Sequence, residues 1–450
     1  MKITKFILVG IVCMIPIQVF AQQPAAASEN NFSLQQCIEY AVSNHISIKS
    51  ATLDQQISVA KVGEIRAAGL PQASIDALMM NNIEVQSMFA RASALDKNAP
   101  SNVIVPLAFG VPYSSSATLG VTQIIFNGTL LVGLQAAKTY TELANKAIDI
   151  NKNSIIQNVS KAYYLTLINE ERKQLFASNL RRMDTLLKQT RLLNQAGFAE
   201  KIDVSRLEVT YNNLLTEKQK FDNLYDLSTL LLKYQMGMNS SDNLTLTDKI
   251  NSFKAIAIEA NTQTLYTNRP EYNVLQSQKR LAELDLKSNK TGYLPSIVAF
   301  GNWGYNNGSI QLSDLYSTSW HKFSNVGLSL KMPVFDGFSK YYKSQQARLT
   351  IEKTNYAIST AERNIDLQVK QAEINLKNST QSLNNQQNNV KLAEEVVKAS
   401  EYKYKQGIGS NLEVVTAESA LKEAQINYYN ALYDVLVYKV DMDFALGNLK

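Results

Sequence analysis

Apolar residues recur at alternating intervals of three and four positions near the end of each half of the chain. In the second half they occupy Val414, Ala417, Leu421, Ala424, Tyr428, Ala431 and Val435. The corresponding positions of the first half are Val204, Leu207, Tyr211, Leu214, Lys218, Phe221 and Tyr225, of which six of seven are apolar or aromatic. This spacing is typical of a coiled-coil seam. It predicts helices at about 201–237 and 411–446 that pack along these stripes.

Each of these helices follows a stretch with almost no helix breakers. Residues 128–195 and 337–405 contain no proline, and Gly133 is the one glycine inside them beyond their first positions. A helix of about 65 residues would be about 100 Å long at a rise of 1.5 Å per residue. Isolated helices gain little stability from propensity alone. We therefore expect each long helix to form an antiparallel hairpin with the helix that follows it.

Short segments of alternating apolar and polar residues precede both long helices. They predict strands at about 72–82 and 117–126 in the first half, and at about 296–305 and 323–335 in the second half. A long loop near residues 85–115 would join the first two strands. Ser33 followed by Gln36 forms a capping-box pattern, which predicts the start of an earlier helix.

The order of these elements is repeated along the chain. Asn44 to Pro71 has the same length as Asn268 to Pro295, and both segments end in Leu-Pro. Two pairs of glycines are each 40 residues apart, Gly197 with Gly237 and Gly407 with Gly447. A period of about 210 residues is too long for a solenoid array. We interpret residues 22–250 and 251–450 as two structural repeats, each built as helix, strand pair, long helix and helix.

The first 21 residues predict export. Lys2 and Lys5 precede an apolar run that ends in Val19-Phe20-Ala21, which together resemble a secretory signal peptide at residues 1–21. After its removal Cys37 would be the one cysteine left, so no internal disulfide could form. The formal net charge would fall from +6 to +4 with the loss of two lysines, which gives no indication of nucleic-acid binding.

The remaining sequence points to a membrane contact through strands. No later stretch has the roughly 18 apolar residues that a membrane helix needs. Four strands cannot close a sheet, and an open edge would leave unpaired backbone groups in hydrocarbon. Three copies would supply 12 strands, a number found in outer-membrane barrels. Aromatic residues near both ends of the strands fit two interfacial girdles, although aromatics filling a soluble sheet are the alternative. They are Trp303, Tyr305 and Trp320 at one end, and Phe126 and Phe335 at the other.

Catalytic chemistry has little support in the sequence. The two histidines, His45 and His321, are far apart, and no Cys/His cluster has metal-ligand spacing. A phosphate-binding glycine loop followed by lysine is also absent from the sequence. We therefore predict no catalytic residues, no metal site and no cofactor, and a passive conduit rather than an enzyme.

In this order and doubled spacing, the motifs resemble the TolC-like outer-membrane efflux proteins. The motifs run from Phe32-Ser33-Leu34 through Leu70-Pro71, Phe126-Asn127-Gly128, Leu294-Pro295, Pro333-Val334-Phe335-Asp336-Gly337 and Tyr404-Lys405-Gln406-Gly407 to Ala445-Leu446-Gly447. The resemblance implies a mainly α fold with a small β part. It also implies a homotrimer in which a 12-stranded outer-membrane β-barrel continues into a 12-helix periplasmic α-barrel of coiled coils.

The resemblance also implies a function and partners. Such proteins are exit ducts of tripartite efflux or type I secretion systems, in the outer membrane of Gram-negative bacteria with a long periplasmic extension. The expected partners are outer-membrane lipid, a periplasmic adaptor protein and an inner-membrane pump of the RND or ABC type. The pump class and the cargo stay open.

By resemblance, the hairpin turns Ala196-Gly197-Phe198 and Gly407-Ile408-Gly409 are where the adaptor docks and where the tunnel closes at rest. Asp203 and Tyr404 match an aspartate and a tyrosine that latch the closed tip in the family. The arginine of that latch falls on Gly409, so part of the lock is missing or replaced.

Glu413 matches the first of two acidic residues that the family places inside the tip, whereas Thr416 stands at the second. Three copies of Glu413 would form a negative ring that attracts cations. The alternative for both Glu413 and Asp203 is an ordinary solvated helix face.

Two other classes of protein share parts of this pattern. A periplasmic adaptor also has a signal peptide and a long helical hairpin, but it would have one hairpin flanked by β-domains. A secreted coiled-coil scaffold would explain the apolar stripes, but it would leave the strands and their aromatic residues without a role.

Overall fold

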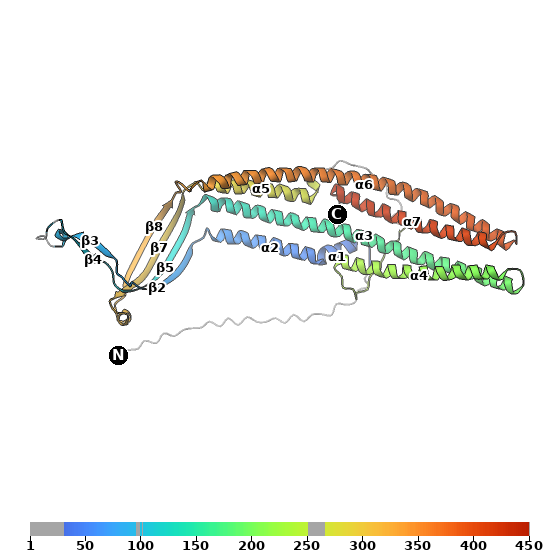
Figure 1. Cartoon of the computed structure of the whole chain (residues 1–450), viewed down its shortest axis with the longest axis horizontal. Helices are drawn as coiled ribbons and strands as arrows, with labels where there is room; N and C mark the ends of the chain where they lie inside the picture. Colours follow the sequence, from blue (N-terminus) through green and yellow to red (C-terminus); the bar gives the residue numbers. More distant parts are fainter. Residues whose placement is uncertain (1–30, 96–99, 101, 251–265, 450) are drawn as a thin grey trace.

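The computed structural model describes residues 31–95, 100, 102–250 and 266–449. The predicted signal peptide and the first residues of the second repeat lie outside these ranges. The described chain is long and narrow, with the helices side by side at one end of a small sheet and a separate strand pair beyond that sheet (Figure 1). Within the described ranges, no helix combines the length and the apolarity needed to cross a membrane.

The helices come in pairs of matching length, one from each half of the chain. The first pair is α2 (Ile46–Ala67) and α5 (Pro270–Thr291), each of 22 residues. The second is α3 (Gly128–Gln195) with 68 residues and α6 (Ser339–Lys405) with 67. The third is α4 (Lys201–Met236) and α7 (Asn411–Leu446), each of 36 residues. A further helix, α1 (Leu34–Asn44), precedes α2.

Local sequence signals account for several helix ends. Ser33 and Gln36 form both bonds of a capping box at the start of α1. The Asn127 side chain accepts a hydrogen bond from the backbone N–H of Leu130 at the start of α3. The second long helix begins at Ser339, two residues later than expected, because Gly337 and Phe338 have positive φ angles of 63° and 65°. Left-handed backbone cannot continue into a right-handed helix.

Four antiparallel strands form the main sheet in the order β2-β5-β7-β8. They are β2 (Gln72–Asn81), β5 (Tyr113–Phe126), β7 (Ser296–Ser309) and β8 (His321–Lys331). We expected the last strand to reach residue 335, but it ends at Lys331, shortly before Pro333, which has no N–H to donate. The predicted loop at 85–115 contains an unexpected hairpin of β3 (Ser87–Arg91) and β4 (Ile104–Ala108).

The two faces of the main sheet differ in polarity. The paired rows across the four strands place Ile75, Leu119 and Trp303 on one face, and the next row places Ser74, Asn302 and Asn325 on the other. The first face also carries Ala73, Ala77, Met79, Val121, Val326 and Leu328. Ile75 is 79% exposed and Val326 is 88% exposed. A single chain therefore leaves an apolar sheet face uncovered.

The largest apolar cluster lies at mid-length of the helical part and joins both halves of the chain. It contains Cys37 of α1, Tyr163 of α3, Leu232 of α4 and Leu432 of α7. Beside it, a short parallel pair of β1 (Asn31–Phe32) and β6 (Thr245–Leu246) brings Asp248 close. Asp248 accepts hydrogen bonds from the backbone N–H of Leu34 at 3.0 Å and the Tyr163 hydroxyl at 2.8 Å. Through Asp248, these bonds hold the start of α1 against the long helix α3.

Both halves end with the same contact. Gly237 and Gly447 terminate α4 and α7 with φ angles of 71° and 72°. A Cβ on Gly237 would meet the Cα of His45 at 3.1 Å, and one on Gly447 would meet the carbonyl oxygen of Asn268 at 2.7 Å. His45 and Asn268 lie just before α2 and α5, respectively. The same close packing of a terminal glycine on the start of the matching helix supports duplication of one unit.

Candidate functional site

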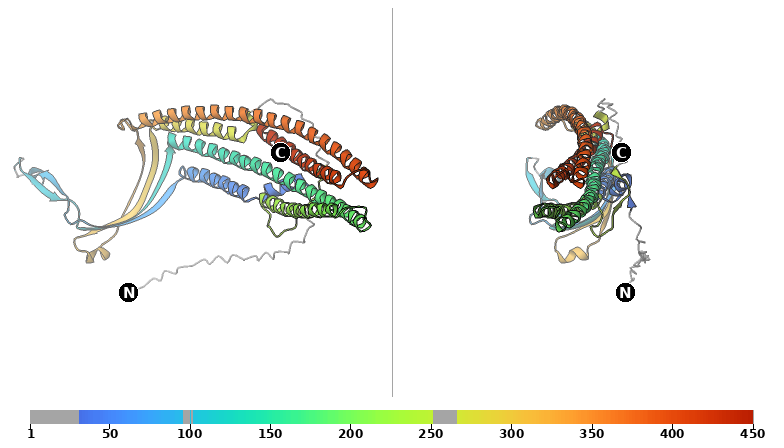
Figure 2. Two further views of the ribbon diagram at one scale, coloured as in Figure 1. Left: turned by 45° about the vertical axis from the view of Figure 1, so that its right-hand side comes forward. Right: turned by 90° about the vertical axis from the view of Figure 1, so that its right-hand side faces the viewer.

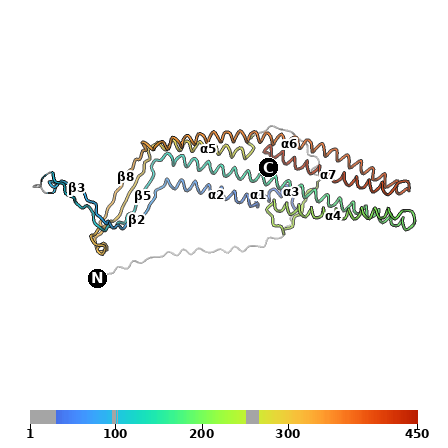
Figure 3. The backbone as a smooth tube through the Cα atoms, viewed as in Figure 1, coloured from blue at the N-terminus to red at the C-terminus, as the bar shows by residue number. Residues whose placement is uncertain are grey.

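The two helical hairpins turn at the end of the molecule that is farthest from the sheet (Figures 1 and 3). At the first turn, Gly197 N–H donates to Asn194 O at 3.0 Å and Phe198 N–H donates to Leu193 O at 2.8 Å. Gly407 and Ile408 make the same bonds to Tyr404 O and Lys403 O at the second turn. This pattern is a Schellman motif, which needs a left-handed residue after the helix. Gly197 and Gly407 supply it, with φ angles of 83° and 77°.

Gly409 has a different role from the glycines before it. A Cβ at this position would lie 2.8 Å from the Cβ of Lys403 and 3.0 Å from the backbone nitrogen of Tyr404. The backbone at Gly409 therefore packs directly on the last turn of α6, and its N–H donates to Lys403 O at 3.1 Å. A larger residue does not fit here without a shift of α6, so the arginine of the family latch has no place in this turn.

The two turns lie beside each other and enclose an open groove of about 1060 Å³. Phe198 is 83% exposed and Ile408 is 76% exposed, so each turn presents a large apolar side chain. The groove between them has a mixed lining of Leu192, Phe198, Glu200, Asp203, Tyr404, Lys405 and Asn411. The tip thus combines exposed apolar side chains with polar groups in a concave surface.

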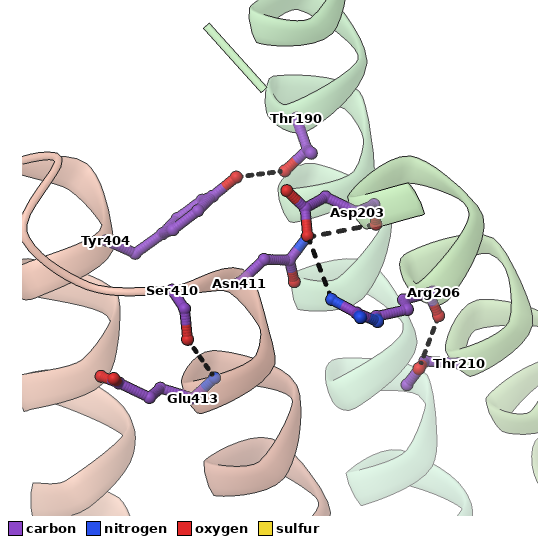
Figure 4. Close-up of polar contacts among 8 residues, drawn as sticks. All are labelled: Thr190, Asp203, Arg206, Thr210, Tyr404, Ser410, Asn411 and Glu413. Atoms are coloured by element: carbon purple, nitrogen blue, oxygen red, sulfur yellow. Dashed lines mark hydrogen bonds and ion pairs between the residues drawn. The ribbon is translucent and has the colours of Figure 1, made fainter. Parts of the chain in front are cut away.

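Two hydrogen bonds connect the hairpins at the tip (Figure 4). The hydroxyl groups of Tyr404 and Thr190 are 3.2 Å apart, and Asn411 Nδ2 donates to the backbone oxygen of Asp203 at 3.1 Å. The Asp203 carboxylate instead pairs with Arg206, one turn along the same helix, at 3.4 Å. The expected bond between Asp203 and Tyr404 is therefore replaced by one between Thr190 and Tyr404.

Thr190 and Asn411 were not predicted as site residues. Thr190 is 0% exposed and continues the buried stripe of Phe176, Met183 and Leu187. A polar residue in such a stripe is a signal that could have drawn attention to it. Asn411 follows the helix cap Ser410, a place where polar residues are common, so no comparable signal marks it. Asn411 is 3% exposed, and its Oδ1 has no hydrogen-bond partner among the described residues.

Glu413 and Asp203 occupy the same place in their helices, the first turns of α7 and α4. The backbone N–H of Glu413 donates to the Ser410 Oγ at 3.2 Å, while the Glu413 side chain is exposed. Acidic side chains are stabilised near a helix N-terminus by the helix dipole. This helix-start role is one explanation for both acidic residues.

Further polar links follow the seam between α3 and α7 away from the tip. Arg182 pairs with Glu418 at 3.1 Å, and Asn179 donates to Gln425 at 3.2 Å. The seam also contains a hydrogen bond from Arg172 to Asn430 and one from Gln157 to Asp441. Burial raises the pKa of the Glu418 carboxyl, and Arg182 opposes that shift. Polar links thus run along the seam between the two hairpins, beside apolar contacts such as that of Leu432 with the cluster around Tyr163.

The fold is similar to that of solved outer-membrane channels. The open-state MtrE outer membrane channel of Neisseria gonorrhoeae superposes with a TM-score of 0.73 at 17% identity, over 95% of both chains. The CmeC outer membrane channel of Campylobacter jejuni superposes with a TM-score of 0.71 at 16% identity, over 97% of this chain and 94% of that one.

Sequence comparison agrees with the structural one. The model of the outer membrane efflux protein family matches residues 262–448. Outer membrane protein TolC of Escherichia coli K12 is 21% identical over 432 residues, which cover 93% of this chain and 82% of the relative. Outer membrane protein TolC of Vibrio cholerae is 22% identical over 340 residues, covering 74% and 77%. Residues 262–448 thus match the outer membrane efflux protein family, and most of the chain is similar to TolC-like outer-membrane efflux proteins. The protein is an outer-membrane protein.

Proposed function

We propose that this protein is the exit duct of a tripartite efflux or type I secretion system. It would conduct substrates passively from a periplasmic adaptor and an inner-membrane pump to the exterior. The observation that carries the proposal is the direct continuation of the strands of a sheet with one apolar and one polar face into the long helices (Figure 1). Each copy of such a chain would supply part of a β-barrel in the membrane and part of a helical tunnel on the periplasmic side of the membrane.

The membrane part of the duct would be a 12-stranded barrel shared by three copies. Each copy contributes the four strands of the main sheet, with its apolar face toward lipid and its polar face toward the lumen. Lipid would cover the exposed Ile75 and Val326, while Ser74, Asn302 and Asn325 would line water. The strands have 10 to 14 residues, enough to cross the hydrocarbon core.

The periplasmic part would be a 12-helix tunnel. Near the sheet, each chain has the four helices α2, α3, α5 and α6 side by side; near the tips it has α3, α4, α6 and α7 (Figures 1 and 2). Four helices at each level give 12 in a trimer. The long helices α3 and α6 run through both levels, so they tie the two parts of the tunnel together.

The tips would hold the gate and the adaptor site. Exposed Phe198 and Ile408 would provide apolar anchors for an adaptor, together with Ala196, Gly197, Gly407 and Gly409 of the turns. The bonds of Tyr404 and Asn411 across the seam support a closed resting arrangement of the two hairpins. An adaptor that binds better to a separated pair of hairpins would shift the channel toward the open state.

The other two classes fit the structure less well. An adaptor would have one long hairpin, whereas the described part of this chain forms two, α3 with α4 and α6 with α7. A secreted scaffold in water would have no reason to expose an apolar sheet face.

Cell fractionation tests the proposed assembly. The full-length protein is expected in the outer membrane, where detergent extracts it as a trimer that dissociates on heating. In a planar bilayer, the purified trimer should form a conducting pore. Recovery as a water-soluble monomer from the periplasm would contradict the proposal and would favour the scaffold.

The charge at Glu413 offers a test of the gate. If three Glu413 side chains surround the pore, Glu413→Lys should lower or reverse the preference for cations, because the ring changes sign. The measurement is the reversal potential of the open channel in a KCl gradient. Glu423→Lys, on the same helix but farther from the tip, is the control. An unchanged reversal potential in Glu413→Lys would assign Glu413 to the helix start alone.

A further inference from the structure

The main sheet ends in two open edges, β2 and β8. Each edge has a row of backbone groups that lack a partner strand among the residues that the structure describes, and the hydrocarbon core does not tolerate such groups. In the proposed trimer, β8 of one copy would pair with β2 of the next copy. The register of this pairing between copies can be inferred from the strand pairs within the chain, and this inference rests on the proposed duct.

The register within each repeat is the same. In the first repeat β2 pairs with β5 through Gln72 and Thr122, and in the second β7 pairs with β8 through Ser296 and Lys331. Ser296 follows Gln72 by 224 positions, the interval that also separates the Leu-Pro motifs. Lys331 follows Thr122 by 209 positions, the interval between Gly128 and Gly337. The duplicated units therefore keep the alignment of their strands residue by residue.

The pair β5 and β7 joins one repeat to the other within the chain, as β8 and β2 would join neighbouring copies. Thr122 lies opposite Phe300 in the pair within the chain. The residue of β8 equivalent to Thr122 lies 209 positions later and is Lys331, and the residue of β2 equivalent to Phe300 lies 224 positions earlier and is Asp76. If the pairing between copies follows the pairing within the chain, Lys331 lies opposite Asp76. By the same shift Leu330 lies opposite Ala77, and Leu328 opposite Met79.

Side-chain chemistry supports this register independently. Asp76 and Lys331 have opposite charge, and both lie on the polar face of the sheet. Both are exposed, and neither belongs to an ion pair among the described residues; the Asp76 carboxylate accepts a hydrogen bond from Ser74 Oγ at 3.1 Å. The neighbouring pairs are apolar and lie on the apolar face.

Other registers lose this match. A shift by one residue would turn the apolar face of one strand toward the lumen. A shift by two would keep the faces but place Lys331 opposite Ser74 or Leu78. Oppositely charged residues stabilise a strand pair when they lie directly across from each other.

We propose that Lys331 of each copy pairs with Asp76 of the neighbouring copy, and that this ion pair fixes the register in which three chains close their shared sheet. The partner surface is thus the β2 edge of a second copy of this chain. The pair would recur three times around the lumen.

Disulfide cross-linking in intact outer membranes tests the register. The double variant Asp76→Cys with Lys331→Cys is expected to form covalent trimers under mild oxidation, which survive boiling in SDS without reductant. Directly opposed residues have Cβ atoms about 4.5–5.5 Å apart, close to disulfide distance, whereas diagonal neighbours are about 7–8 Å apart. The native Cys37 can stay, since it is buried and its burial raises the thiol pKa to about 12.

The matched controls are the two single variants and the shifted pair Asp76→Cys with Ser329→Cys, which should give little covalent trimer. A stable trimer that cross-links best through the shifted pair would overturn the register and leave the proposed duct intact. A protein that is monomeric in every variant and in the wild type would overturn the duct itself.

A charge exchange provides a second readout that does not depend on oxidation. Asp76→Lys and Lys331→Asp should each lower the temperature at which the extracted trimer dissociates, since each places like charges opposite each other. The combined exchange should recover most of that loss. Additive losses in the combined variant would show that the two residues do not meet.

Discussion

Replacing Tyr404 by Phe and Asn411 by Ala in the same chain is expected to open the resting channel. The two substitutions remove the bond to Thr190 and the bond to the Asp203 backbone, which connect the hairpins at the tip. A hydrogen bond contributes about 1 kcal/mol net, so a trimer that opens as a unit would lose about 6 kcal/mol from its closed state. A difference of about 5.5 kcal/mol moves a two-state equilibrium from 1:99 to 99:1.

The measurement is the conductance of the purified trimer in a planar bilayer without adaptor or pump. We expect the double variant to conduct at least ~10-fold more than the wild type, because a population shift of this size exceeds that factor. The control variant carries Tyr402→Phe and Asn212→Ala, which change the same residue types at exposed positions of the two hairpins. A double variant with wild-type conductance would show that these bonds do not hold the gate.

The same conductance measurement distinguishes the contact between Thr190 and Tyr404 in the structure from the latch between Asp203 and Tyr404 that the sequence suggested. If Asp203 and Tyr404 formed the latch, Asp203→Ala would open the channel as much as Tyr404→Phe, because alanine cannot accept the hydrogen bond of the phenol. In the structure the Asp203 carboxylate pairs with Arg206 of its own helix, and Asn411 uses the backbone oxygen of Asp203. We therefore expect Asp203→Ala, which keeps that backbone oxygen, to change the conductance less than Tyr404→Phe does.

The helical part of the fold could be predicted because its signals are local or periodic. A stripe such as Leu207 to Leu214 indicates a helix face, and the glycines at 197 and 407 mark the turns. The doubled spacing of motifs added the relation between the two halves. The hairpin of β3 and β4 was missed because its strands are five residues each and lie within a segment without a clear alternating pattern.

The contacts of the site could not be predicted in the same way. Thr190 and Tyr404 are 214 positions apart, and whether they meet depends on how α3 and α6 are rotated about their axes. Gly409 is a similar case, since its close approach to Lys403 is a property of the folded turn. The resemblance indicated Asp203 and Tyr404, whereas in the structure the Asp203 carboxylate pairs with Arg206 and the Tyr404 hydroxyl lies 3.2 Å from that of Thr190. The role of these residues in a gate stays a prediction.

Stability is expected to depend strongly on Arg269, which lies just before α5. Its side chain is largely buried, with 4% of the residue exposed, and connects three helices of the second repeat. The guanidinium donates to Ala445 O at the end of α7 at 2.9 Å and to Gln368 Oε1 of α6 at 3.1 Å. It also lies 4.8 Å from the centre of the Phe444 ring.

Arg269→Met should destabilise the protein by about 3–5 kcal/mol, the range for breaking a buried charged network. Methionine has a similar length but cannot donate, so the Ala445 carbonyl at the end of α7 would lose its partner. The readout is the temperature at which the extracted trimer dissociates and unfolds. We expect it to fall by about 6–20 °C, given a shift of roughly 2–4 °C per kcal/mol in larger domains.

The matched control is Arg280→Met on α5, where the side chain is 65% exposed and lies 3.7 Å from Glu142. An exposed ion pair contributes about 0–1 kcal/mol, so this variant should dissociate close to the wild-type temperature. Arg269→Lys should fall between the two, because a lysine keeps the charge but cannot reach Ala445 and Gln368 with one planar group. Equal losses in Arg269→Met and Arg280→Met would show that the buried network does not hold α5, α6 and α7 together.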